Sequence, residues 1–156
     1  MFREMRRKDR EKSPEEARRI LRDAKNGVLS IMLENGYPYG VPMSYVFEDD
    51  TIYFHSAVAG QKYDALLQNP KVCFSVIGKD EIQPGKFATN YNSAIAFGRA
   101  SLVEDEGEIN HVLKLIAQKY NPTASPESLQ EYTQARLGKF CVFQIKIEHL
   151  AGKGNT

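Results

Sequence analysis

Two prolines stand inside one predicted β-strand, and they restrict the sheet that this chain can form. An apolar strand and the segment 37–47 flank Asn35-Gly36, which is a hairpin turn signal. Pro38 and Pro42 have no N–H to donate, so the strand 37–47 must lie at a sheet edge or be interrupted. A third strand, 51–56, follows after an acidic turn. The order of these segments predicts a meander of three antiparallel strands.

The other elements follow from capping residues and from the spacing of apolar side chains. The stretch 13–16, Ser-Pro-Glu-Glu, contains a capping box that predicts a helix start. The stretch 140–150 alternates apolar and polar side chains, as a strand with one buried face does. Further strands are predicted at 71–77 and 91–103, further helices at 108–120 and from 125 to Gly138, and a loop at 78–85. Six antiparallel strands, with helices at the start, middle and near the end, predict a mainly β fold: a small closed barrel with peripheral helices.

The length and charge of the chain limit the partners that we expect. Its 156 residues, 1–156, suffice for a single domain with a buried core, of which 1–12 form a basic, solvated arm. A net charge of +1 gives no electrostatic reason to expect nucleic acid as the main partner. No apolar stretch is long enough to cross a membrane. Cys73 and Cys141 each fall in a predicted strand, which favours buried free thiols and a cytoplasmic location.

The segment 54–62 has the residues of an anion site. A strand ends near His55 and Ser56, a turn of small residues follows, and a helix begins near Lys62. The first N–H groups of a helix have no partner within it and favour negative charge. Ser56, Gly60 and Lys62 around that helix end describe a site for an anion, most simply a phosphate. The alternative reading is a surface turn with a solvated lysine.

Several common site types have no matching pattern. The three histidines are far apart, neither cysteine has a nearby Cys or His, and no nucleophile elbow, P-loop or dinucleotide fingerprint occurs. We therefore expect no metal site and no Rossmann-type nucleotide site. His55 stands beside the predicted anion site, either as a packing residue or as a catalyst. The stretch 42–45 reads as an interrupted strand whose unpaired backbone groups could bind the polar edge of a flat ring.

The order of several segments resembles a known family. The segments 37–45, 52–57, 60–62 and 69–74 are similar to the flavin-binding split-barrel superfamily of pyridoxamine 5′-phosphate oxidase. Within it the chain is most similar to the nitroimidazole-resistance (Nim) branch, which the segments 5–10, 91–100 and 119–120 also resemble. The resemblance implies a six-stranded antiparallel split barrel. It also implies a homodimer with two FMN molecules in the grooves between its subunits.

The resemblance also assigns roles to individual positions. It implies that Val41, Met43, Ser44 and Tyr45 line the isoalloxazine ring, that His55 and Ser56 face the ribityl-phosphate, that Gln61 and Lys62 bind the phosphate, and that Ser93 makes a polar flavin contact. An arginine commonly precedes the phosphate-binding lysine in the oxidase, and here that position is Gln61. The chain has no tryptophan and so lacks the oxidase's C-terminal substrate motif, which argues against pyridoxamine phosphate as the substrate.

The function hypothesis is an FMN-dependent oxidoreductase. Its small-molecule substrates would be nitroaromatic, as in 5-nitroimidazoles, or otherwise electron-poor, with NAD(P)H or another reductant as electron donor. His55 is the candidate catalytic residue, since its reference pKa suits proton transfer near neutral pH. The alternatives are a non-catalytic flavin-binding or redox-sensing protein, and a haem-handling split barrel that uses His55 or His149 as the axial ligand. A third alternative makes the basic arm a contact for nucleic acid or a partner.

Overall fold

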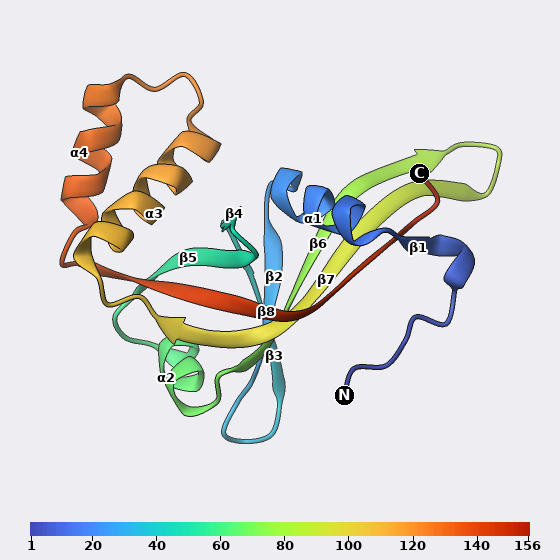
Figure 1. The fold of residues 1–156 in the computed structure, drawn as a ribbon, viewed down its shortest axis with the longest axis horizontal. Coiled ribbons are helices and arrows are strands. Elements are labelled where there is room, and N and C mark those ends of the chain that lie inside the picture. The colour runs from blue at the N-terminus through green and yellow to red at the C-terminus, as the bar shows by residue number, and fades with distance from the viewer.

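The computed structural model describes residues 1–156 and consists of one curved antiparallel sheet with four α-helices around it (Figure 1). None of these helices is both long enough and apolar enough to cross a membrane. After a 3₁₀ turn at Lys8–Arg10, the elements in chain order are β1 (Glu11–Lys12), α1 (Pro14–Asp23), β2 (Gly27–Met32), β3 (Pro38–Met43), β4 (Val46–Glu48), β5 (Thr51–Ala57), α2 (Gln61–Gln68), β6 (Lys71–Gln83), β7 (Ala88–Leu102), α3 (Glu106–Tyr120), α4 (Pro126–Arg136) and β8 (Phe140–Gly154).

The sheet has two free edges, so it is a split barrel and not a closed one. Its strand order is β3-β2-β6-β7-β8-β5-β4, with β1 paired to β8. The edge strands β3 and β4 follow each other in the chain, separated only by Ser44 and Tyr45. The predicted three-stranded meander is therefore wrong, because β4 and β5 lie at the opposite edge of the sheet from β2 and β3.

The strand count is eight and not six, for two reasons. The predicted strand 37–47 is interrupted, as its prolines allowed, and its halves pair with different partners: β3 with β2 and β4 with β5. The predicted solvated arm also joins the sheet at its end, where Glu11 and Lys12 pair with Lys153 and Gly152 of β8. The mainly β antiparallel fold class is confirmed.

Strands β6 and β7 form a long ribbon that extends beyond the body of the sheet (Figure 1). The predicted loop at 78–85 is wrong over most of its length, because β6 continues to Gln83 and pairs with β7 as far as Ala88. Most side chains of β6 beyond Ile77 are exposed. A ribbon with both faces in solvent has no apolar alternation, so its charged sequence resembles that of a loop.

The core follows from the two-residue alternation of the strands and the 3.6-residue repeat of the helices. The inward faces of the strands form a cluster around Phe54, Phe74 and Phe143, all at most 1% exposed. The predicted capping box of α1 is present between Ser13 and Glu16, and the apolar face of this helix packs against the same cluster. A second cluster lies under α3, where the predicted apolar positions of that helix meet β4 and β8.

Tyr45 fixes the split between β3 and β4. Its side chain is fully buried, lies edge-on to Phe74 with ring centres 4.8 Å apart, and donates its hydroxyl to the Leu21 carbonyl. The end of α3 then supplies partners for its backbone: Tyr45 N donates to the Tyr120 hydroxyl at 3.1 Å, and Lys119 Nζ donates to Tyr45 O at 3.0 Å. These two side chains satisfy backbone groups that the strand break removes from the ladder.

Candidate functional site

The helix predicted at the phosphate-binding segment is present as α2. It begins at Gln61, one residue before the predicted start, after the N-cap residue Gly60. Gly60 has a φ of 111°, a backbone conformation that residues with a Cβ rarely adopt. No side chain caps the first turn, so its N–H groups remain available to an anion. Asp64 is the acidic residue within this turn, and Glu34 lies in the same hollow as Gly60 and Gln61.

Lys62 is half-buried at this helix end. Burial lowers the pKa of its ammonium group from the usual value. Its Nζ lies 6.0 Å from the centre of the Phe54 ring, and none of the ion pairs in the chain includes it. A partly desolvated ammonium without a carboxylate partner fits the predicted role of a phosphate ligand.

His55 lies on the opposite face of β5 from the core-facing Phe54 and Ser56. Its ring stands edge-on to Phe140, with ring centres 5.7 Å apart, and its Nδ1 is buried without a hydrogen-bond partner. The pKa of His55 is lowered, first by burial and then by the nearby positive charges of Arg136 and Lys62. Burial and these two cations therefore favour the neutral form of the imidazole near pH 7.

Arg136, the last residue of α4, is the residue of this site that the sequence analysis missed. Its guanidinium lies over the Tyr132 ring, with Cζ 3.7 Å from the ring centre. Its Nε is buried without a hydrogen-bond partner, and no carboxylate pairs with it. Its charge acts on His55, because α4 leads into β8, which pairs with β5. No spacing in the sequence connects two residues so far apart.

Two predicted phosphate ligands have other surroundings. Ser56 is 4% exposed and its hydroxyl donates to the Ala57 carbonyl at 3.0 Å, so it is not presented to a ligand in this arrangement. Its position could have been found from the alternation of β5, which places it on the same side as the apolar Phe54. Gln61 lines a hollow of about 860 Å³ together with Glu34 and Asp64, two carboxylates that would repel a phosphate.

The residues predicted to line a flavin ring divide into two groups. Val41 and Met43 are half-buried on the edge strand β3, and Ser44 is exposed at the break that follows. Tyr45 differs from the expectation. Its side chain lies in the core, and both its N–H and its carbonyl are engaged by α3, so it has no free group for a ligand.

Ser93 is far from the rest of the predicted site within one chain. It pairs with Lys153 near the end of β8, whereas His55 pairs with Val142 near the start of that strand. The eleven residue-to-residue steps from Val142 to Lys153 cover about 36 Å along the strand, at roughly 3.3 Å per step. One copy of the chain therefore does not bring Ser93 to His55.

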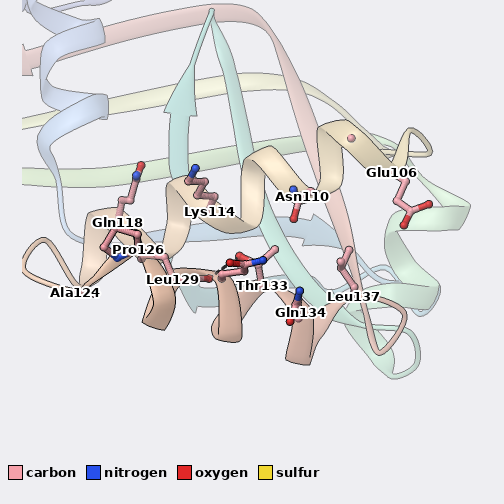
Figure 2. Close-up of a pocket in the computed structure, with 12 residues that line it drawn as sticks. Glu106, Asn110, Lys114, Gln118, Ala124, Pro126, Leu129, Thr133, Gln134 and Leu137 are labelled. Carbon is pink, nitrogen blue, oxygen red and sulfur yellow. Dashed lines mark hydrogen bonds between the residues drawn. The ribbon is translucent and has the colours of Figure 1, made fainter.

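A separate hollow, on the helical side of the molecule, holds none of these residues. It lies between α3 and α4 and has a volume of about 900 Å³ (Figure 2). Amide side chains from both helices line it, and only three of its twelve lining residues are hydrophobic. The labelled residues include Asn110, Gln118 and Gln134. The groove also contains a cation outside every ion pair, Lys114, but this side chain is exposed, whereas Lys62 and Arg136 are partly buried.

The comparison with protein families agrees with this geometry. A model of the family described as pyridoxamine 5′-phosphate oxidase matches residues 13–154. The chain belongs to this family. The resemblance to the flavin-binding split barrels is thereby confirmed over nearly the whole sequence. No curated protein is similar enough to count as a match.

Several solved structures share the fold. One, from Bacteroides thetaiotaomicron, is provisionally described as a 5-nitroimidazole antibiotic resistance protein; it is 24% identical over 91% of this chain and 84% of its own, with a TM-score of 0.75. A conserved hypothetical protein of Mycobacterium tuberculosis is 19% identical over 97% and 90%, with a TM-score of 0.82. An FAD-binding protein of Mesorhizobium loti is 22% identical over 94% and 98%, with a TM-score of 0.68.

The described residues fit the phosphate end of a flavin. Lys62 supplies an unpaired cation and the first turn of α2 supplies unpaired N–H groups. His55 and Arg136 add two buried nitrogen atoms without partners. Buried polar atoms are normally satisfied, and those that are not often mark a ligand site. This arrangement can bind a phosphate or another oxyanion.

Proposed function

We propose that the chain is an FMN-dependent oxidoreductase that reduces small electron-poor molecules, with nitroaromatics as the first class to test. The observation that carries the proposal is the group of cations at the end of β5, which has no carboxylate partner and lies beside an uncapped helix. Membership of the pyridoxamine 5′-phosphate oxidase family supports a flavin as the ligand. The fold shared with a provisional nitroimidazole-resistance protein supports the substrate class.

In this proposal the residues of the chain have separate tasks. Lys62 and the first turn of α2 bind the phosphate, and the edge strand β3 with Val41, Met43 and Ser44 borders the ring. The bound flavin supplies hydride or electron transfer. His55, neutral at neutral pH, orients the substrate or exchanges a proton with it. NAD(P)H or another reductant donates the electrons.

We propose further that the functional unit is a homodimer with FMN between its subunits. The outer face of β2, β6 and β7 carries five apolar side chains that are each 37–67% exposed: Val28, Met32, Ile77, Ile95 and Phe97. Ser93 pairs directly with Ile77 and so lies on this outer face. A second copy of the chain that covers this face would bury these side chains. It would also bring the Ser93 of the first copy into contact with the surface of the second. A site that needs Ser93 is therefore completed by the partner.

The first test is the visible spectrum of freshly purified protein, with the chromophore released by heat and identified. We expect paired near-ultraviolet and blue bands and released FMN. Release of FAD would show that the flavin is FAD and not FMN. A single intense Soret band would show that the cofactor is haem and not a flavin. A colourless protein that takes up no added flavin would refute the proposal.

Turnover separates an enzyme from a flavin carrier or redox sensor, which needs the same groove. The assay is steady-state reduction of a nitroaromatic compound by NAD(P)H with the holoprotein. Sustained reduction above that of free FMN supports the enzyme. Stable flavin binding together with a rate equal to that of free FMN would favour the non-catalytic alternative.

A further inference from the structure

Two side chains hold the buried side-chain nitrogen atoms of this chain that have no hydrogen-bond partner. They are His55, on β5, and Arg136, at the end of α4. These residues are 81 positions apart in sequence, yet the positive charge of Arg136 acts on the His55 ring. A buried nitrogen without a hydrogen-bond partner destabilises the fold unless a ligand or water completes it.

The surroundings of these two nitrogens are cationic and contain no carboxylate partner. Arg136 and Lys62 both act on His55 as positive charges, and neither takes part in an ion pair. The guanidinium does not move freely, since it stacks on Tyr132 and donates from Nη1 to the Tyr132 carbonyl at 3.4 Å. Two positive charges that act on the same ring also repel each other, and an anion bound beside that ring would offset the repulsion.

We propose that Arg136 is a ligand-binding residue and forms, with His55 and Lys62, an oxyanion site. The inference rests on the proposed flavin function and extends it. Arg136, at the end of α4, supplies a guanidinium to the surroundings of His55, and Lys62 supplies an ammonium group from α2. The oxyanion is either the flavin phosphate or an anionic group of the substrate.

The test compares Arg136→Gln with the wild-type protein for matched ligands. FMN and riboflavin differ by the phosphate, and 4-nitrobenzoate and nitrobenzene differ by a carboxylate. Arg22→Gln is the control, because Arg22 is exposed on α1 and lies outside every ion pair. Arg136→Lys retains the charge and shows whether the site still folds. Dissociation constants come from flavin fluorescence and KM values from steady-state reduction.

If the phosphate is the oxyanion, Arg136→Gln weakens FMN binding by roughly 10- to 100-fold and leaves riboflavin binding unchanged, as expected for a charge-assisted contact. If the oxyanion is a group of the substrate, Arg136→Gln binds both flavins normally. Its KM then rises for 4-nitrobenzoate but not for nitrobenzene. Unchanged values for all four compounds would overturn the proposal. An equal loss for FMN and riboflavin would do the same, since it indicates a structural role.

The failure of the proposed function gives a different result. In that case the wild-type protein binds neither FMN nor riboflavin, and inorganic phosphate becomes the probe. At matched ionic strength, phosphate should then raise the Tm of the wild-type protein and of Arg22→Gln by several degrees more than that of Arg136→Gln. An equal rise in all three proteins would overturn the oxyanion site independently of any flavin.

Discussion

Replacing Tyr120 with phenylalanine should weaken the hydrogen bonding that holds the backbone between β3 and β4, without changing the core. The Tyr120 hydroxyl accepts from Tyr45 N at 3.1 Å and donates to the Lys25 carbonyl, so the substitution removes both contacts. A buried donor left without a partner costs about 1–3 kcal/mol. Tyr120 is 36% exposed, so water can replace part of what is lost. We expect the free energy of unfolding to fall by about 1–2 kcal/mol.

For a chain of this length that loss corresponds to a fall in Tm of roughly 2–8 °C. The measurement is urea or thermal unfolding at one fixed protein concentration, since association would change the apparent stability. Tyr37→Phe is the matched control, because Tyr37 is 70% exposed and its hydroxyl has no hydrogen bond. Amide exchange at Tyr45 should also accelerate in Tyr120→Phe. A loss below about 0.5 kcal/mol with unchanged exchange at Tyr45 would show that the Tyr120 hydroxyl does not stabilise the strand break.

Three further changes test other parts of the argument. Burial lowers the pKa of Lys119 to about 8 from 10.5. Between these two pH values the Lys119 side chain keeps its proton in the unfolded chain but has lost it in the folded chain. The free energy of unfolding should therefore rise with pH in the wild type but not in Lys119→Met. A difference in stability between the two proteins that does not change with pH would contradict this. His55→Ala, assayed with FMN at saturating concentration so that flavin occupancy is not limiting, should lose nitroaromatic turnover; unchanged turnover would remove His55 from the mechanism. Ile95→Asp should dissociate the homodimer in sedimentation experiments, whereas the control Leu67→Asp, on α2, should not, and a wild-type monomer would refute the interface.

The local signals of the sequence predicted most of the secondary structure. Ser13 and Glu16 form their capping box, and the turn at Asn35-Gly36 joins two paired strands. Such signals act within a few residues, so they do not depend on the rest of the fold. The pairing of strands does depend on it. The prolines of the segment 37–47 indicated an edge or an interruption, but not that the two halves occupy opposite edges of one sheet.

The same distinction holds for the candidate site. The strand, turn and helix around Lys62 were predicted, because all of their determinants lie within nine residues. The approach of Arg136 to His55 was not, because it depends on the pairing of β8 with β5. Tyr45 was assigned to the ligand although its backbone groups are taken by α3, a contact between residues about 75 positions apart. A contact at that separation leaves no periodic signal in the sequence.

None of the ion pairs of the chain includes His55, Lys62 or Arg136, as the proposed oxyanion site requires. The chain has 20 acidic residues, and seven of its eight ion pairs join lysines or arginines to them. A purely structural arginine at position 136 would be more stable beside one of these acids, since an unpaired, partly buried guanidinium costs stability. An acid at that place would, however, occupy the cations that an anionic ligand needs. Most of the 21 lysines and arginines take part in no ion pair, so it is partial burial beside His55 that sets Arg136 and Lys62 apart, and the proposed anion would compensate this burial.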